Sequence, residues 1–308
     1  MTSSPAASIS EPSTSVLATP AASQCSDNAA SPDSEVSAPS VPAFDSVAPR
    51  AKRTRRPAKK RESKPTKPKI RTKDPFERQA ELLKMKNDRL QAGHNFMCQR
   101  QLYMSSTEFS DRKKYEATNG DFVSTRFEIV PLPGARSVKA VIDALQFFVY
   151  NIEISLSEVV GDITVRENDD AKPGSPVAQH RLVATVADMV QTDTNNVAFA
   201  EYRPAGPPGS CEHEYGLMIC DAVDEDELFP YRPQTRIRQD MTQITMVTMD
   251  QTKTGEPMIV MTRRWCLRIR KSDIYMPPFV VERIRSGVEK VGEAMLATAR
   301  RATNSTSI

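Results

Sequence analysis

The sequence predicts an α+β fold in which a curved antiparallel sheet wraps around a long C-terminal helix. Short segments with alternating apolar and polar residues follow one another between residues 163 and 271, and turn-rich stretches separate them. Parallel strands would need a helix between each pair, so this spacing indicates antiparallel pairing. The chain then closes with an amphipathic helix whose apolar stripe needs a sheet to cover it. A disordered arm, a basic run and another amphipathic helix are expected before this domain.

Residues 1–49 form the expected disordered arm. They contain 13 Ser, 10 Ala and 7 Pro, together with five acidic residues and no Lys or Arg. Such a composition buries too little apolar surface to offset the backbone entropy lost on folding, about 1–2 kcal/mol per residue. We therefore expect the folded domain to begin well after this arm.

The basic character of the chain is concentrated in residues 50–73, which carry thirteen Lys or Arg residues against the single acid Glu62. Prolines interrupt this segment, which favours an extended, solvated chain. Its two tight clusters suit a nuclear import receptor, and they could also contact the phosphates of a nucleic acid. A merely solvated tail is the remaining alternative. We expect a nuclear protein, otherwise a cytoplasmic one, with the basic contacts made by Lys52, Arg53, Arg55, Arg56, Lys59, Lys60 and Arg61.

A helix and a linker are expected over residues 74–118. Asp74 can cap the helix, and Pro75 suits its first turn. Apolar residues recur at seven-residue spacing from Phe76 to Met104, which raises the alternative of a weak dimer through residues 75–104. The companion seam positions are mostly polar, however, and Asp74-Pro75 breaks the continuous helix of a basic zipper. An amphipathic helix packed on the domain is the favoured interpretation.

The domain itself is expected over residues 119–303. It begins with a strand at Ser124–Val130 and a helix capped by Ser137, with apolar residues at three-and-four spacing. The terminal helix is expected from about Pro278 to Arg301. The further strands are expected at Ile163–Glu167, Arg181–Ala187, Val197–Tyr202, Tyr215–Ala222, Arg238–Asp250 and Pro257–Lys271.

The strand around Trp265 carries the candidate site. Alternation places Arg263 in an otherwise apolar row, between Met261 and Trp265. A buried guanidinium needs a partner, which could be a structural carboxylate or the charged head of a ligand. Gly287 and Gly292 lie inside the terminal helix and could leave room for a ligand or permit close packing. The predicted cavity wall consists of Met261, Arg263, Trp265, Leu267, Ile284, Val288 and Val291.

No sequence motif indicates catalysis. A metalloprotease helix, a nucleophile elbow, a phosphate loop and a catalytic Cys/His pair are all missing, so we expect neither an enzyme nor a cofactor. Cys211, His213 and Cys220 lack an evident fourth zinc ligand, and the acidic run at residues 221–227 lacks the features of a calcium loop, so no metal site is expected and that run should be a solvated loop. No apolar run is long enough to cross a bilayer, which excludes a transmembrane segment.

Several strings resemble a known family. They are Glu158–Glu167, Val223–Pro233 and the stretch TRRWCLR at residues 262–268 before a long terminal helix. These strings are similar to START-like proteins of oomycetes, including members labelled mating-specific, over about residues 121–303. The resemblance implies a helix-grip fold with a cavity for a lipid or another hydrophobic small molecule. That family often carries a basic zipper, from which this proline-broken segment departs.

Two functions follow as expectations. The first is a nuclear START-like module that binds a hydrophobic ligand or a protein partner. The alternative is a structural nucleic-acid-binding protein similar to a viral coat subunit, in which a basic arm precedes a β-rich domain. A terminal helix fits the first better, because jelly rolls are built from strands.

Overall fold

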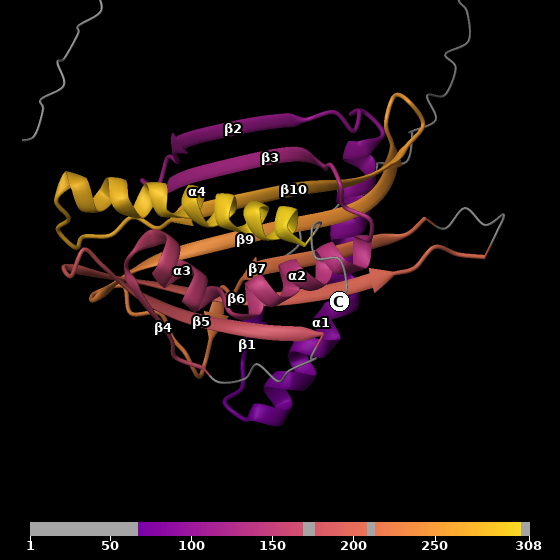
Figure 1. Cartoon of the computed structure of the whole chain (residues 1–308). Coiled ribbons are helices and arrows are strands. Elements are labelled where there is room, and N and C mark those ends of the chain that lie inside the picture. The colour runs from indigo at the N-terminus through magenta and orange to yellow at the C-terminus, as the bar shows by residue number, and fades with distance from the viewer. Residues whose placement is uncertain (1–66, 169–175, 208–212, 303–308) are drawn as a thin grey trace, which may run out of the picture. The chain divides into compact units, whose positions relative to one another are not determined.

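The computed structural model describes residues 67–168, 176–207 and 213–302 (Figure 1). The expected arm at residues 1–49 and the basic clusters at residues 52–61 lie outside these described residues, and so does Cys211.

Most of the described strands form one curved sheet, as expected. Its eight strands are hydrogen-bonded in the order β2-β3-β10-β9-β7-β6-β5-β4, and each neighbouring pair is antiparallel. A short parallel pairing of β6 with β9 is added at one end. The strands are β2 (Phe109–Glu116), β3 (Phe122–Leu132), β4 (Ile163–Arg166), β5 (Val177–Val186), β6 (Val190–Arg203), β7 (Tyr215–Ala222), β9 (Arg236–Gln251) and β10 (Pro257–Ile269).

Three helices cover the inner face of this sheet. The terminal helix α4 (Pro278–Arg301) lies along it, beside α2 (Val138–Tyr150) and α3 (Ile152–Val160) (Figure 1). The hydroxyl oxygen of Ser137 accepts a hydrogen bond from the amide of Ala140 at 3.2 Å, which caps α2 as expected. The buried sides of α2 and α4 match the predicted stripes, since Val141, Leu145 and Ile284 are all buried. The predicted α+β fold with a clasped C-terminal helix is confirmed.

Helix α1 (Pro75–Gln101) packs on the outer face of the same sheet. The Asp74 carboxylate accepts hydrogen bonds from the amides of Phe76 and Glu77, each at 2.9 Å. The seven-residue stripe is only partly the buried face: its members Leu90 and Met97 are buried, whereas Phe76 is 83 % exposed and Leu83 is 44 % exposed. The other buried residues of α1 are Arg78, Leu82 and Gly93.

Two short segments differ from the expected linker and basic tail. β2 occupies part of the stretch that we expected to be a linker up to residue 118, and it forms an edge of the large sheet. Its sequence FSDRKKYE is charged and its side chains are all exposed, so no alternation marks it as a strand. β1 (Lys69–Ile70) lies in the expected basic segment and pairs in parallel with β8 (Glu225–Asp226). The folded unit therefore starts before residue 119.

The inner helices differ from the sequence pattern in one respect, because the apolar spacing from Val138 to Ile152 predicts a single helix. That helix instead ends at Tyr150, and α3 starts two residues later at an angle of 77°. Among the described residues no single helix is long and apolar enough to cross a membrane, although α2 and α3 taken together reach the required length and composition.

Candidate functional site: a cavity between the sheet and the terminal helix

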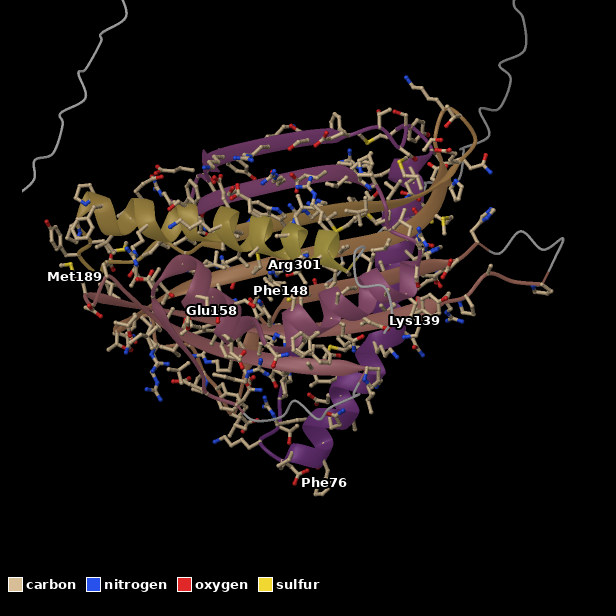
Figure 2. All side chains as sticks on the ribbon, viewed as in Figure 1. Phe76, Lys139, Phe148, Glu158, Met189 and Arg301 are labelled. Carbon is tan, nitrogen blue, oxygen red and sulfur yellow. The ribbon has the colours of Figure 1, made fainter. Side chains whose placement is uncertain are left out.

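A cavity of about 170 Å³ lies between the inner face of the sheet and helices α2, α3 and α4. Phe148 of α2, labelled in Figure 2, is one of its apolar wall residues. The sheet contributes alternate residues of β10, β9, β7, β6 and β5, because only every second side chain points inward. The apolar walls include Phe148, Val149, Ile152, Leu156, Leu182, Met241 and Met295.

All but one of the residues expected at the cavity wall line this cavity. Arg263, Trp265 and Leu267 reach it from β10, and the other three, Ile284, Val288 and Val291, reach it from α4. Met261 does not line it. Its partners across the sheet are Val130 on β3 and Val247 on β9, and it is fully buried in the core beneath α2 and the end of α4. Alternation along β10 correctly turns Met261 inward, but the helices close on the sheet at that point and leave no space.

Arg263 is bound on two sides within the protein. It is 1 % exposed, and its Nε donates to Oε2 of Glu128 at 2.5 Å. Its Nη1 donates to the carbonyl oxygen of Gly292 at 2.7 Å, which joins the sheet to α4. Burial lowers the pKa of Arg263 from its ordinary value, and the charge of Glu128 counteracts that effect. Of the two partners expected for Arg263, the structural carboxylate is present, and it is that of Glu128.

Two buried donors of β10 nevertheless lack a hydrogen-bond partner among the described residues. They are Nη2 of Arg263 and Nε1 of Trp265, a side chain that is only 2 % exposed. A Cβ atom placed on Gly292 would lie 3.9 Å from both terminal nitrogens of Arg263 and 4.0 Å from Nε1 of Trp265. The two donors thus flank one open place beside Gly292. This glycine leaves room beneath the helix and does not mark a close contact with the sheet.

The cavity also has polar walls that the sequence did not reveal. His180 on β5 is buried, and burial, helped by the nearby charge of Arg166, lowers its pKa to about 3. Cys220 on β7 keeps its proton, because burial raises the pKa of its thiol to about 12. A neutral imidazole and a protonated thiol can form hydrogen bonds but offer no activated nucleophile. The other polar wall residues are Asp162, Thr164, Thr192, Thr194, Asn196, Gln239, Gln243 and Arg283.

An ion pair lines the cavity near the start of α4. Nε of Arg283 lies 2.9 Å from each carboxylate oxygen of Asp162. The same carboxylate accepts a hydrogen bond from the amide of Ala187 at 3.0 Å, so it connects the turn between β5 and β6 to the helix. Arg283 is partly exposed, and its hydrogen bond to Asp162, together with the charge of that carboxylate, raises its pKa.

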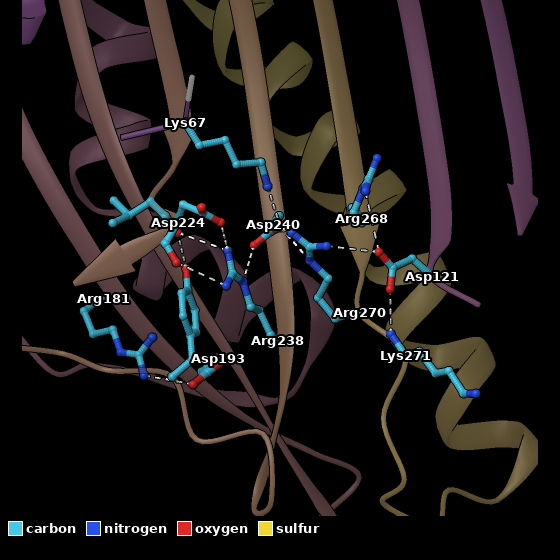
Figure 3. Close-up of polar contacts among 12 residues, drawn as sticks. Lys67, Asp121, Arg181, Asp193, Asp224, Arg238, Asp240, Arg268, Arg270 and Lys271 are labelled. Carbon is cyan, nitrogen blue, oxygen red and sulfur yellow. Dashed lines mark hydrogen bonds and ion pairs between the residues drawn. The ribbon is translucent and has the colours of Figure 1, made fainter. Parts of the chain in front are cut away.

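On the outer face, charged residues form a structural network (Figure 3). The buried carboxylate of Asp240 accepts hydrogen bonds from Lys67 at 2.7 Å, Arg238 at 2.6 Å and Arg270 at 2.9 Å. Asp121 binds the other side of Arg270 at 3.2 Å. Although burial opposes it, this hydrogen bonding lowers the pKa of Asp240. These ion pairs connect Lys67, next to β1, with strands β9 and β10.

The acidic run at residues 221–227 is not simply the solvated loop that we expected. Asp226 is buried, and Arg78 of α1 binds both of its carboxylate oxygens, at 2.8 and 3.0 Å. Gln179 and Asn195 donate to Oδ2 of Asp226 at 2.7 and 2.9 Å. The run therefore anchors α1 to the sheet. Across the described ranges, no group of three or more His, Cys, Asp or Glu side chains gathers as a metal site would require.

A second cavity, of about 860 Å³, lies on the outer face between the end of α1 and strands β7 and β9. Its lining mixes methionines with charged groups such as Glu214 and Asp250. Pro204 and His213 also line it, on either side of the undescribed residues 208–212. The inner cavity is the stronger candidate because it holds the buried donors that lack partners.

Comparisons with known proteins identify no family for this chain. Protein-family models and curated proteins both yield no match. Among solved structures, a conserved protein from Geobacillus kaustophilus is similar with a TM-score of 0.27 and 10 % identity, over 60 % of this chain and 95 % of that one. Ara h 8.0201 is similar with a TM-score of 0.23 and 10 % identity, over 57 % of this chain and 97 % of that one. The function of this chain is therefore argued from its own residues.

Proposed function

We propose that this chain is a ligand-binding module that holds a small hydrophobic molecule between its sheet and α4. The observation that carries the proposal is a mostly apolar cavity lined by buried hydrogen-bond donors of the sheet that find no partner in the described part of the chain. Concave, mostly apolar sites with a few placed polar groups are typical of small-molecule binding.

The volume limits the size of the ligand. An engineered apolar cavity of about 150 Å³ binds benzene, and the cavity here is close to that size, at about 170 Å³. One ring with a short chain fits this volume, whereas a long-chain lipid exceeds it. The proposed ligand is therefore a small molecule with an apolar body rather than a membrane lipid.

Trp265 provides a direct test, because it is the only tryptophan of the chain and it lines the cavity. A panel of one-ring hydrophobic molecules is titrated while the tryptophan emission is followed. We expect saturable quenching or a shift of the emission for at least one molecule. If no molecule changes the emission and calorimetry detects no binding either, the proposal is overturned.

Two matched variants locate the binding. Val288→Phe places a larger side chain in the cavity, and Val281→Phe makes the same change on α4 at a position that does not line it. We expect the dissociation constant of the ligand to rise at least about tenfold, or 1.4 kcal/mol, in the first variant and to stay within about twofold in the second. Equal effects in both variants would contradict binding in this cavity.

We propose further that the basic clusters at residues 52–61 direct the chain to the nucleus, on the strength of their sequence. A fluorescent fusion of the full chain is expected to accumulate in nuclei. Replacing the seven Lys and Arg residues of these clusters by Ser should redistribute it to the cytoplasm, whereas an unchanged distribution would contradict this role. The role of a coat subunit is not proposed, since the large described sheet encloses a helix instead of packing against a second sheet.

A further inference from the structure

We infer that the ligand is a carboxylic acid whose carboxylate binds between Arg263 and Trp265, beside Gly292. The inference rests on the proposed function and specifies the ligand that the cavity would hold. It follows from the direction of two hydrogen-bond donors, from the local charge balance and from the shape of the space between sheet and helix.

The donors require an acceptor. Indole and guanidinium nitrogens can donate hydrogen bonds but cannot accept them, so Nη2 of Arg263 and Nε1 of Trp265 cannot satisfy one another. Both lie at van der Waals distance, 3.9 and 4.0 Å, from the position that a Cβ atom of Gly292 would occupy. A group that occupies this place needs two acceptor oxygens, one directed to each donor. A carboxylate has this arrangement.

The charge balance favours an anion over a neutral acceptor. Arg126 and Arg263 both bind the single carboxylate of Glu128, so one partly buried and one buried guanidinium share that negative charge. Two acids of α4 act from further away. The charge of the exposed Glu293 acts on Arg263, and Glu289 lies 2.7 Å from Lys114 and 3.4 Å from Arg112. Among the described residues neither of them forms an ion pair with Arg263. An anionic ligand would therefore place a second negative charge in direct contact with Arg263.

The lack of a side chain on Gly292 of α4 leaves the space between the two donors free. Gly292 sits in the interior of α4, where glycine is less favourable than alanine. An alanine methyl would meet nothing closer than 3.9 Å, so steric exclusion does not explain the glycine. The methyl would instead occupy the space between the two donors. The apolar body of the acid would extend from this place along Leu267, Ile284 and Val288, which line the same cavity.

Hydrocinnamate and hydrocinnamyl alcohol form a suitable pair of probes, because they share an apolar body and differ in the charged group. Binding of each to the full chain is measured by isothermal titration calorimetry at pH 7. Hydrogen bonds to a charged group contribute more than neutral ones. We therefore expect the acid to bind at least about tenfold more tightly than the alcohol, a difference of 1.4 kcal/mol.

Three variants test the position of the carboxylate. Trp265→Phe removes one donor and keeps a ring, and Gly292→Ala fills the space between the donors. Both are expected to bring the two affinities to within about twofold of each other. Gly287→Ala is the matched control for position, since it adds a methyl to the same helix at another place in the cavity wall, beside Val160 and away from the two donors, where a Cβ would lie 3.6 Å from the nearest atom. It should keep the preference for the acid, and circular dichroism verifies that each variant is folded.

The binding measurements distinguish failure of the carboxylate inference from failure of the proposed function. Equal affinity of acid and alcohol for the unaltered chain overturns the carboxylate inference and leaves the ligand-binding module in place, as would be found if the donors hold only water. Failure of both probes and of the wider panel overturns the proposed function as well. A preference for the acid that survives both Trp265→Phe and Gly292→Ala would place the carboxylate elsewhere and also overturn the inference.

Discussion

Arg263 shows how one buried side chain can serve both the fold and a binding site. One nitrogen binds Glu128 on β3, another binds a carbonyl group of α4, and the third remains without a partner beside the cavity. The contacts to Glu128 and Gly292 hold the guanidinium in position, so the remaining donor points in a defined direction. Such preorganisation lowers the entropy lost when a ligand binds.

Glu128→Gln tests the structural half of this arrangement. It leaves the buried guanidinium of Arg263 and the partly buried one of Arg126 without their shared carboxylate. Loss of one partner from a buried ion pair typically costs 3–5 kcal/mol, so we expect the free energy of unfolding to fall by about 3 kcal/mol. Urea denaturation measures it. Glu282→Gln is the control, because that carboxylate is exposed on α4 and its loss should change the stability by less than about 0.5 kcal/mol.

His180 predicts a pH dependence of stability. Its folded-state pKa of about 3 lies below the unfolded value of about 6.5, so the unfolded chain takes up the proton first as the pH falls. The contribution of His180 to stability is therefore fully present above pH about 6.5 and is lost progressively towards pH 3. Between pH 7 and 5 this contribution lowers the free energy of unfolding by about 2 kcal/mol. In His180→Gln the loss of unfolding free energy over this range should be smaller by that amount, and an unchanged loss would contradict the assignment.

At the scale of elements, two glycines in helix interiors have opposite roles. A Cβ on Gly93 would lie 2.4 Å from Cδ1 of Ile219, because α1 approaches β7 closely there. A Cβ on Gly292 of α4 would meet its nearest atoms only at 3.9 Å, an ordinary van der Waals distance. Helix propensity treats both positions alike, whereas their tertiary surroundings differ.

The two glycine variants should therefore change stability in opposite directions. Gly93→Ala gains helix propensity but forces Ile219 or the helix to move, and overpacking typically costs about 1–3 kcal/mol. Gly292→Ala should stabilise the protein by up to about 1 kcal/mol, since the methyl fits without displacing a neighbour. Thermal unfolding compares the two with the unaltered chain. A loss of stability in Gly292→Ala would show that the space beside this glycine is not open.

At the scale of the whole folded unit, the segment before α1 is part of the structure. Ile70 of β1 is buried, and Lys67 binds the buried Asp240. Amides of the acidic run complete the contact, since Asp224 donates to the carbonyl of Pro68 at 2.7 Å and Glu227 donates to that of Ile70 at 3.0 Å. The end of the basic segment thus closes one side of the domain.

Two shortened chains test this contribution. A chain that begins at residue 67 retains all of these contacts, and we expect its unfolding free energy to match that of the full chain within about 1 kcal/mol. A chain that begins at residue 74 loses β1 and leaves the surface beneath Ile70 exposed. Burial of an isoleucine side chain contributes about 1.5–3 kcal/mol, so the second chain should be less stable by about 3 kcal/mol or more. Equal stability of both chains in urea would contradict a structural role for β1.

Strand β2 and the polar wall residues of the cavity could not be predicted from the sequence. In β2 charged residues occupy both faces of the strand, so its sequence shows no alternation of apolar and polar residues. His180, Asn196 and Gln243 are polar residues that point inward, and alternation alone cannot distinguish a polar inner face from a solvated one. Apolar alternation around Trp265, by contrast, identified the inner face of β10 correctly.

The sequence by itself determined the strands of the large sheet other than β2, the clasped terminal helix and the need of Arg263 for a charged partner. These follow from local periodicity and from the cost of burying a charge, both of which act wherever the chain folds. Only the tertiary structure decided which carboxylate meets Arg263, why Met261 is core while Leu267 faces a cavity, and which face of α1 is buried. Such choices depend on contacts between residues far apart in the chain, as between Glu128 and Arg263, which are 135 positions apart. The relative positions of whole elements set these contacts, and no local pattern encodes them.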